Sequence, residues 1–347
     1  MIYLHDDLPQ MVERAVKRWD GTAWTEGLSR NPATAFVALL QGASNPFQTP
    51  DTEIDWDGLA DWAAWCDAKN LKYDRVVEQS TSLGDLLREI CAAGRAFPRH
   101  DGVRWGVVID RPSDLVVDHI SPRNSDGFTW ARSYFEPPHA FRVTFFDETN
   151  DFEAAERIIP WPGRTGDIAI TEQIQLPGKT DPDEIWIEAR RRMHELMLRA
   201  DTFTASQSGA ARVVTRGDLV MGSYDVLSRN QVSARVTRLE GALIELDELP
   251  PQAGVDLGLR FRVFADDQDP IGTSQVRPIR VLVAGAPLVE LVGTGPLPAL
   301  GDLVHIGPLE QVSLPLRVRG IESGQAFTSI LNMVPAAPRI DLLTDAE

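Results

Sequence analysis

The sequence is poor in lysine and cysteine, and it has no long apolar run. Only four lysines occur among the 34 basic residues, so arginine supplies nearly all of the positive charge. The two cysteines, Cys66 and Cys91, exclude a disulfide framework, and a reduced, packed role is expected for both. No stretch approaches the ~18 consecutive apolar residues that a membrane-spanning helix needs. The N-terminus also lacks the basic and apolar regions of a signal peptide.

Basic residues are outnumbered along the whole chain. The 51 acidic residues exceed the 34 basic ones and give a net charge of −17. The excess is 33 against 22 over residues 1–200 and 18 against 12 over residues 201–347. This balance gives no basic footprint for sequence-specific DNA binding. With 43% apolar and 24% charged residues the chain is typical of globular proteins, and 347 residues are enough for two or three domains.

The motifs that would identify an enzyme are missing or incomplete. The sequence has no Walker lysine, no dinucleotide glycine fingerprint, no Gly-x-Ser-x-Gly elbow and no cysteine pair at metal spacing. His194-Glu195 lies in a helical pattern, but Leu198 stands where a metalloprotease motif has its second histidine. We therefore predict a protein that is not an enzyme, with no catalytic residue, no metal site and no cofactor.

Paired carboxylates keep a hydrolase open as an alternative, since a glycoside hydrolase needs only two. Such pairs occur at Asp6-Asp7, Asp147-Glu148 and Asp266-Asp267. In a chain with 51 acidic residues they are expected by chance, and we interpret them as solvated turns. His119 alternates with apolar neighbours, which favours a hydrogen-bonded strand residue over a catalytic base.

Helical signals dominate the first part of the chain, which also holds all nine tryptophans. Three helices are expected from capping and stop signals at Asn31-Pro32 and Gly42, at Asp55 or Asp57, and at Ser82 and Gly94. Short strands at 95–98, 103–109 and 114–119 follow.

The rest of the chain reads mainly as strands. An antiparallel pair is expected at 139–146 and 153–159, then a strand at 168–175 and a helix over about 182–200. From residue 211 onward, short alternating strands are separated by glycine, proline and aspartate turns, a pattern typical of barrels and sandwiches. The predicted fold class is α+β and β-rich.

Five residues are candidates for an interface with another protein, and four of them lie in a weak internal repeat. Gly217-Asp218-Leu219-Val220 precedes the strand of Arg235 and Arg238, and Gly301-Asp302-Leu303-Val304 precedes the strand of Arg317 and Arg319. We expect either two corners of related β-structure or a coincidence of common turn chemistry. Arginine suits fixed interface pairs, which makes these four side chains candidates for an interface.

Trp161 is the fifth candidate interface residue. It lies in the turn Pro160-Trp161-Pro162-Gly163, whereas most other tryptophans stand at helical or strand spacing beside apolar residues. We expect Trp161 to be an exposed anchor for another protein, because tryptophan is enriched at such contacts.

The order of these segments resembles one family over nearly the whole chain. This is the central tail-tip hub of long-tailed phages, the lambda-type host-specificity protein J, with its relatives in gene transfer agents. The resemblance lies in many weak motifs in the right order: Arg18-Trp19-Asp20-Gly21, Asn31-Pro32-Ala33, Trp65-Cys66-Asp67, Ile90-Cys91-Ala92-Ala93-Gly94-Arg95, Val107-Val108-Ile109-Asp110-Arg111-Pro112, Phe141-Arg142-Val143-Thr144-Phe145, the helix over 190–199, Gly217-Asp218-Leu219-Val220 and Val318-Arg319-Gly320-Ile321-Glu322.

The resemblance implies a trimeric hub in which each subunit adds two β-barrels to a ring that continues the tail tube. Members of the family are longer, with an upstream barrel and downstream fibre regions. The implied domains are a connector at 1–30, a small α/β peripheral domain at 31–111, a tube-type β-barrel at 112–222 plus 301–340 with a packed helix at about 182–200, an inserted small β-barrel at 223–300, and a C-terminal tail at 341–347.

The resemblance further implies a structural component of the virion tail tip, assembled in the host cytoplasm. Its expected partners are two further copies of itself in a homotrimer, other tail-tip and tail-tube proteins, and tail fibre modules. DNA would pass without specific binding, and the host cell surface would be reached indirectly. The alternatives are a tail-associated cell-wall or polysaccharide hydrolase and a host receptor-binding module.

Overall fold

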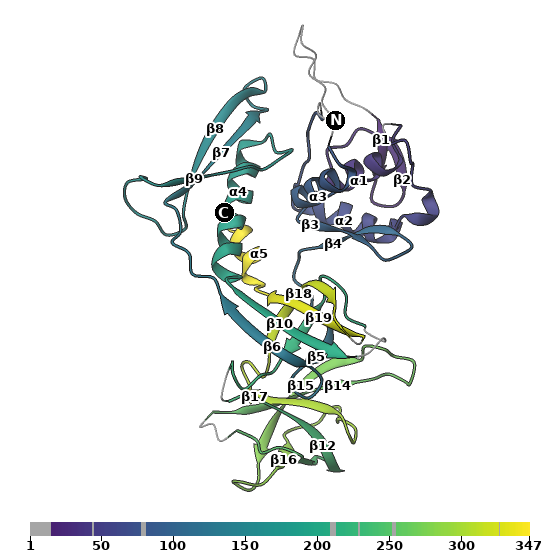
Figure 1. The fold of residues 1–347 in the computed structure, drawn as a ribbon, viewed down its shortest axis with the longest axis vertical. Helices are drawn as coiled ribbons and strands as arrows, with labels where there is room; N and C mark the ends of the chain where they lie inside the picture. Colours follow the sequence, from purple (N-terminus) through teal and green to yellow (C-terminus); the bar gives the residue numbers. More distant parts are fainter. Residues whose placement is uncertain are drawn as a thin grey trace. The chain divides into compact units, whose positions relative to one another are not determined.

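The computed structural model describes residues 15–43, 45–77, 81–208, 213–227, 230–251, 255–325 and 327–347. The fold is α+β and β-rich, with 38% strand and 19% helix, which confirms the predicted class. The chain divides into two compact units (Figure 1). The first comprises Met1–Arg111, Phe135–Leu196 and Arg339–Glu347, and the second comprises Pro112–Tyr134 and Met197–Pro338. Within the described ranges, no helix is long and apolar enough to cross a membrane.

The first unit begins with a small helical part. Its elements are the hairpin β1 (Val16–Trp19) and β2 (Trp24–Gly27), the helices α1 (Pro32–Gln41), α2 (Trp56–Ala68) and α3 (Leu83–Ala93), the short 3-10 helix η1 (Asp51–Glu53), and the hairpin β3 (Ala96–His100) and β4 (Trp105–Ile109). The predicted N-caps are confirmed. The side chains of Asn31, Asp55 and Ser82 each accept a hydrogen bond from a backbone N–H in the first turn of α1, α2 and α3.

Both cysteines lie in the core of this part, as the sequence predicts. Cys66 and Cys91 are both buried thiols outside any disulfide. Burial raises the pKa of the Cys66 thiol, so the reactive thiolate is disfavoured. Trp62 fills the space beside them: its ring meets Phe36 edge-on at 5.9 Å, and its Nε1 donates to the Gly94 carbonyl at 2.8 Å.

A three-stranded sheet and two helices complete the first unit. The strands β7 (Ala140–Asp147), β8 (Glu153–Pro160) and β9 (Thr171–Ile174) run in the order β8-β7-β9. Helix α4 (Pro182–Leu198) packs on this sheet through Ile185, Ala189 and Met193, while Leu196 and Met197, expected on the same apolar stripe, are each 39% exposed. Residues 341–347, expected as a tail, instead begin within α5 (Arg339–Thr344) and bury Asp341 and Thr344.

The second unit contains an open six-stranded sheet. Its order is β5 (Val116–Ile120), β11 (Leu219–Gly222), β18 (Leu314–Ser323), β19 (Thr328–Pro335), β10 (Asp201–Ser208) and β6 (Asp126–Arg132). Alternation along β10 places Phe203 and Ala205 in a core with Leu331, while Thr202 and Thr204 point to the other face. Strand β6 ends the sheet and pairs only with β10 among the described strands.

A closed six-stranded barrel forms the rest of the second unit. Its order is β12 (Val232–Glu240), β13 (Leu243–Leu246), β16 (Leu288–Leu291), β15 (Thr273–Val281), β14 (Leu257–Val263) and β17 (Leu303–Pro308). The barrel extends beyond the range expected at 223–300, because β17 pairs with both β12 and β14 and closes it. Apart from β17, the strands of the segments 112–222 and 301–340, which were expected to form a tube-type barrel, lie in two sheets that are not closed among the described strands.

Candidate assembly surfaces

Trp161 is buried, so it is not the exposed anchor that its turn sequence predicts. Its side chain is 7% exposed and belongs to the core between the β7–β8–β9 sheet and α4. The indole packs edge-on against Phe141 at 5.5 Å and against Phe135 at 6.0 Å. The turn aims the ring inward because the Trp161 backbone N–H donates to the His139 carbonyl at 3.0 Å.

The Gly-Asp turns of the two repeats form equivalent corners. Each turn bonds to the arginine-bearing strand of the other repeat. The turn Gly217-Asp218 pairs with Val318 of the second repeat: Gly217 N donates to Val318 O at 2.8 Å, and Val318 N donates to Asp218 O at 3.0 Å. The turn Gly301-Asp302 makes the same pair of bonds with Val236 of the first repeat, at 2.8 and 3.1 Å. The expectation of related β-corners is therefore confirmed, and we call each of them a clamp.

An arginine and an aspartate complete each clamp. Arg317 Nη1 donates to the Gly217 carbonyl at 3.4 Å, and Arg235 Nη1 donates to the Gly301 carbonyl at 3.0 Å. On the other side, Asp218 and Asp302 each accept a backbone N–H at 2.6 Å, from Thr215 and Ala299 respectively. Two of the four candidate arginines thus hold the chain's own turns.

The other two candidate arginines are exposed. Arg238 on β12 pairs with Glu240 at 2.5 Å, and both side chains are largely accessible to solvent. Arg319 stands at the irregularity of β18 between Val318 and Gly320, where a bulge re-aims side chains. Of the five candidate residues, Arg317 and Trp161 are buried; the arginines lie on β12 and β18 of the second unit, and Trp161 follows β8 of the first.

Removal of the aspartate from either clamp should lower the free energy of unfolding by a similar amount. We expect Asp218→Ala and Asp302→Ala each to lower the free energy of unfolding by about 1 kcal/mol, because each loses the acceptor of a backbone N–H. Chemical denaturation measures both, with the exposed Glu310→Ala as a control that should change by less than about 0.5 kcal/mol. A loss in only one of the two variants would contradict the equivalence of the clamps.

The carboxylate pairs do not share one environment. Asp266 accepts from Gln268 N and Asp147 accepts from Thr149 N, as solvated turns would. Glu148 differs from the prediction, because it is largely buried in an ion pair with Arg30. Asp6-Asp7 lie outside the described residues. Over the described ranges, no group of three or more His, Cys, Asp or Glu side chains is placed to hold a metal ion.

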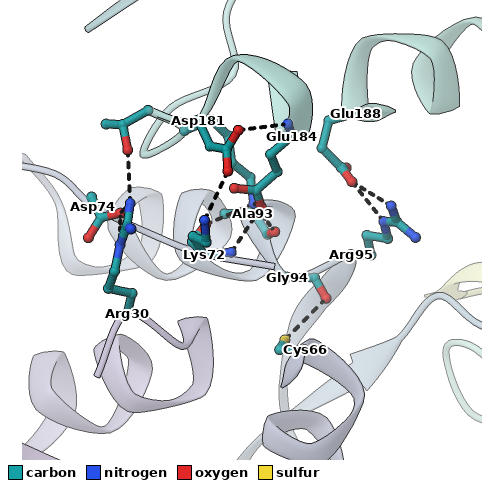
Figure 2. Close-up of polar contacts among 12 residues, drawn as sticks. Arg30, Cys66, Lys72, Asp74, Ala93, Gly94, Arg95, Asp181, Glu184 and Glu188 are labelled. Carbon is teal, nitrogen blue, oxygen red and sulfur yellow. Dashed lines mark hydrogen bonds and ion pairs between the residues drawn. The ribbon is translucent and has the colours of Figure 1, made fainter. Parts of the chain in front are cut away.

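A chain of ion pairs, which the sequence did not reveal, joins the helical part of the first unit to α4 (Figure 2). Its centre is Lys179, whose side chain is 2% exposed. The Lys179 ammonium donates to the carbonyls of Lys72 and Ala93, each at 2.8 Å, and to Glu184 at 2.5 Å. Its three donors are therefore all satisfied. Burial raises the pKa of Glu184, and Lys179 opposes that rise.

A second buried pair lies beside the first. Arg95 donates through Nε and Nη2 to one oxygen of Glu188, at 2.9 and 2.6 Å (Figure 2). Arg95 adopts a φ of 53°, a left-handed backbone that a residue with a Cβ seldom takes. The strained position follows the end of α3 and brings the guanidinium to α4. Because both partners are buried, removal of either side chain of this ion pair should lower the free energy of unfolding strongly.

Two histidines form a second unpredicted cluster, in the second unit. His119 lies on β5 in a hydrogen-bonded strand, as the sequence indicates, with Nε2 at 2.9 Å from Ser274 Oγ. His305 on β17 is fully buried, and the two rings are 5.1 Å apart. Sequence reasoning missed His305 because it alternates with barrel-core residues and therefore appears to face solvent.

Strand β6 is the most exposed edge of the six-stranded sheet. Six of its seven residues are exposed, and Trp130 keeps 50% of its surface accessible. Tyr134, which follows the strand, is 89% exposed. The strand contains no lysine and no proline, two residue types that protect an edge from pairing with another chain, and its charged residues Asp126 and Arg132 stand at its two ends.

Comparison with known proteins gives only distant structural similarity. No family model and no curated protein matches the chain. Several solved structures align with parts of it, among them three phage-related structures. The tail protein from Neisseria meningitidis MC58 has 11% identity and a TM-score of 0.35, and the alignment covers 62% of this chain and 56% of that one. For the 43 kDa tail protein of prophage MuSo2 from Shewanella oneidensis the values are 10%, 0.29, 58% and 62%.

The third structure is a native gene transfer agent virion, with 16% identity, a TM-score of 0.30, and 70% of this chain and 48% of that one covered. This chain therefore spans about half to three fifths of the length of the three structures it matches. Identities and TM-scores this low do not assign the chain to a family.

Proposed function

We propose that this chain is a structural component of a phage or phage-like tail tip, where copies of it form a ring that continues the tail tube. The observation that carries the proposal is the unprotected edge of β6. Although its pairing with β10 shifts register near Ser206, this exposed edge strand has no lysine or proline, and an exposed edge is a template for pairing with another chain. Trp130 on this edge and Tyr134 beside it are residue types enriched at protein contacts.

In a closed ring, the exposed edge strand of every copy gains a partner from a neighbouring copy. When each subunit offers one edge and receives another, the contact is head to tail, and it ends only by closing around a symmetry axis. We propose three copies, as expected from the resemblance to tail-tip hubs. The sheets that are open within one copy would then be completed by neighbouring copies, other tail-tip proteins and fibre modules.

One face of the same sheet suits a passage for DNA. Opposite its apolar core, the part of this face on β6 and β10 is rich in hydroxyl side chains, and Thr129 and Thr204 face each other across the two strands with their hydroxyls 2.5 Å apart. The same face also carries Thr202, Ser206, Ser208, Thr328 and Asn332, together with Ile330, the acidic Asp126 and Glu322, and the buried Arg317. Short neutral side chains on an acidic chain offer phosphates few cations to hold them. We propose that this face lines the passage.

A charge placed on β6 should prevent assembly. We expect the unaltered protein to sediment as a trimer and Ala131→Lys to sediment as a monomer, because an edge lysine opposes strand pairing. The matched control is Thr237→Lys, an equally exposed small residue on β12 of the barrel, which should remain a trimer. Sedimentation and native mass spectrometry give the mass of each species.

Two results would overturn this proposal. The first is a strict monomer of the unaltered protein at high concentration. The second is assembly of Ala131→Lys as tight as that of the Thr237→Lys control, which would remove β6 from the contact. Turnover of peptidoglycan or polysaccharide, or binding to cells of a single host, would support the alternative functions instead.

A further inference from the structure

The second unit contains an internal joint between β5 of the open sheet and the outer wall of the barrel. Alternation along the barrel strands points Leu259, Phe261 and Ile306 into the barrel core. Arg260, Arg262 and His305 lie on the other side of β14 and β17, where solvent would be expected. Here β5 covers them: His119 contacts Ser274, and Arg262 Nη1 donates to the Val117 carbonyl at 3.3 Å.

The hydrogen bonds of the joint suit a neutral His119. Arg260 Nη1 donates to Ser274 Oγ at 3.0 Å, and an arginine can only donate. The Ser274 hydroxyl proton is therefore free to bond His119 Nε2, which we assign as the acceptor. His305 Nδ1 lies 3.0 Å from Ser313 Oγ. One nitrogen of each ring, His119 Nδ1 and His305 Nε2, is buried without a partner.

The charged groups around both rings are nearly all positive. From β14, Arg260 and Arg262 face the two histidines, and each histidine faces the other. Among the described residues, the carboxylate that pairs with these arginines is Asp118 on β5, at 3.3 Å from Arg262, and it also accepts from Gln207 and from the His119 backbone N–H. A proton added to either ring would add a buried positive charge beside two guanidinium groups, with no free carboxylate to balance it.

We propose that the contact of β5 with β14, β15 and β17 is a proton-sensitive joint, which acid opens so that the barrel separates from the six-stranded sheet. The proposal does not depend on the proposed function, since it concerns one copy of the chain. Proton binding favours the open joint because both rings are 1% exposed or less when it is closed and reach solvent when it opens.

The direction and size of the effect follow from linkage. Burial, with the neighbouring cations, lowers the pKa of His119 to about 2 and that of His305 to about 3 in the closed joint. An exposed histidine has a pKa of about 6.5. Below that pH the open form takes up protons that the closed form excludes, so the ratio of open to closed rises about tenfold per pH unit for each histidine. Two histidines approach about a hundredfold per unit, and they give about 250-fold between pH 6.5 and pH 5, because each ring is already half protonated in the open form at pH 6.5.

Spin-label distances can follow the joint in the intact chain. One label replaces Thr202 on β10 and the other replaces Arg280 on β15; both positions are exposed, and Cys66 and Cys91 are buried and will not react. We expect one distance at pH 7.5 and a second, longer one that appears below pH 6.5 and dominates by pH 4. A control pair at Arg238 and Arg280, both on the barrel, should not change.

Histidine variants separate this joint from general acid denaturation. The double variant His119→Gln, His305→Gln cannot be protonated there and should lose the pH response, while the exposed His100→Gln should keep it. The proposal is overturned if the distance in the unaltered protein stays constant from pH 7.5 to pH 4. It is equally overturned if the control pair changes together with the joint pair, or if the double variant keeps the full response.

Discussion

Replacing Lys179 by methionine should lower the free energy of unfolding by about 3–5 kcal/mol, the cost of leaving one member of a buried ion pair alone. Lys179 and Glu184 are 2% and 6% exposed, so the carboxylate of Glu184 stays buried when the ammonium is lost. The carbonyls of Lys72 and Ala93 lose their donor in the same variant. Chemical denaturation followed by tryptophan fluorescence suits this measurement, because eight of the nine tryptophans lie in the first unit.

The loss of unfolding free energy caused by Lys179→Met, called the deficit below, should also depend on pH. Burial already raises the pKa of Glu184, and removal of Lys179 removes the charge that opposes this rise. A carboxyl whose pKa is raised in the folded state costs stability increasingly as pH rises above its unfolded pKa of about 4.3. The deficit should therefore be smaller at pH 5 than at pH 8. A deficit that is equal at both pH values would contradict an uncompensated Glu184.

Two control variants frame this result. Arg88→Met breaks the exposed pair with Asp85 and should change stability by less than about 1 kcal/mol. Replacement of both Lys179 and Glu184 by methionine should recover much of the loss, because it leaves no buried charge unpaired. If the double variant were as unstable as the single one, lost packing would explain the effect, and the ion pair would not.

Truncation of Trp161 to alanine should lower the free energy of unfolding by about 3–5 kcal/mol and leave assembly intact where the protein still folds. The ring is 7% exposed and packs on Phe141 and Phe135, so its loss leaves a cavity beside α4. Denaturation gives the stability, and sedimentation under native conditions gives the assembly state.

Trp130→Ala provides the opposite expectation. Trp130 is 50% exposed on β6, with its Nε1 donating to Asp201 at 3.1 Å. We expect a loss of about 1 kcal/mol or less in the free energy of unfolding, as for most surface positions, together with weakened assembly. Equal stability losses in the two variants would contradict the assignment of Trp161 to the core and Trp130 to the surface.

Local chemistry made the helices of the first unit predictable. The caps Asn31 and Ser82 act on backbone groups only two or three residues away, so a sequence pattern is sufficient to locate them. The buried stripe of α4 follows from its helical period in the same way. The strands were expected for similar reasons, since alternation is a property of neighbouring residues.

The features that the sequence did not reveal depend on contacts between distant segments. Trp161 lies in an exposed-looking turn and is buried by Phe141 and Phe135, on other segments. His305 faces outward from its barrel strand and is covered by β5, nearly 190 residues earlier. The two repeats were visible, but the exchange of their partners, which joins Gly217 to Val318 and Gly301 to Val236, is a matter of long-range pairing.

The most direct test of ring assembly through β6 is electron microscopy of the purified protein at high concentration. The account predicts rings with threefold symmetry, in which β6 of each copy lies against its neighbour and the hydroxyl-bearing face of the sheet surrounds an open passage. Single particles that stay monomeric at every concentration, or rings in which β6 faces solvent, would contradict it.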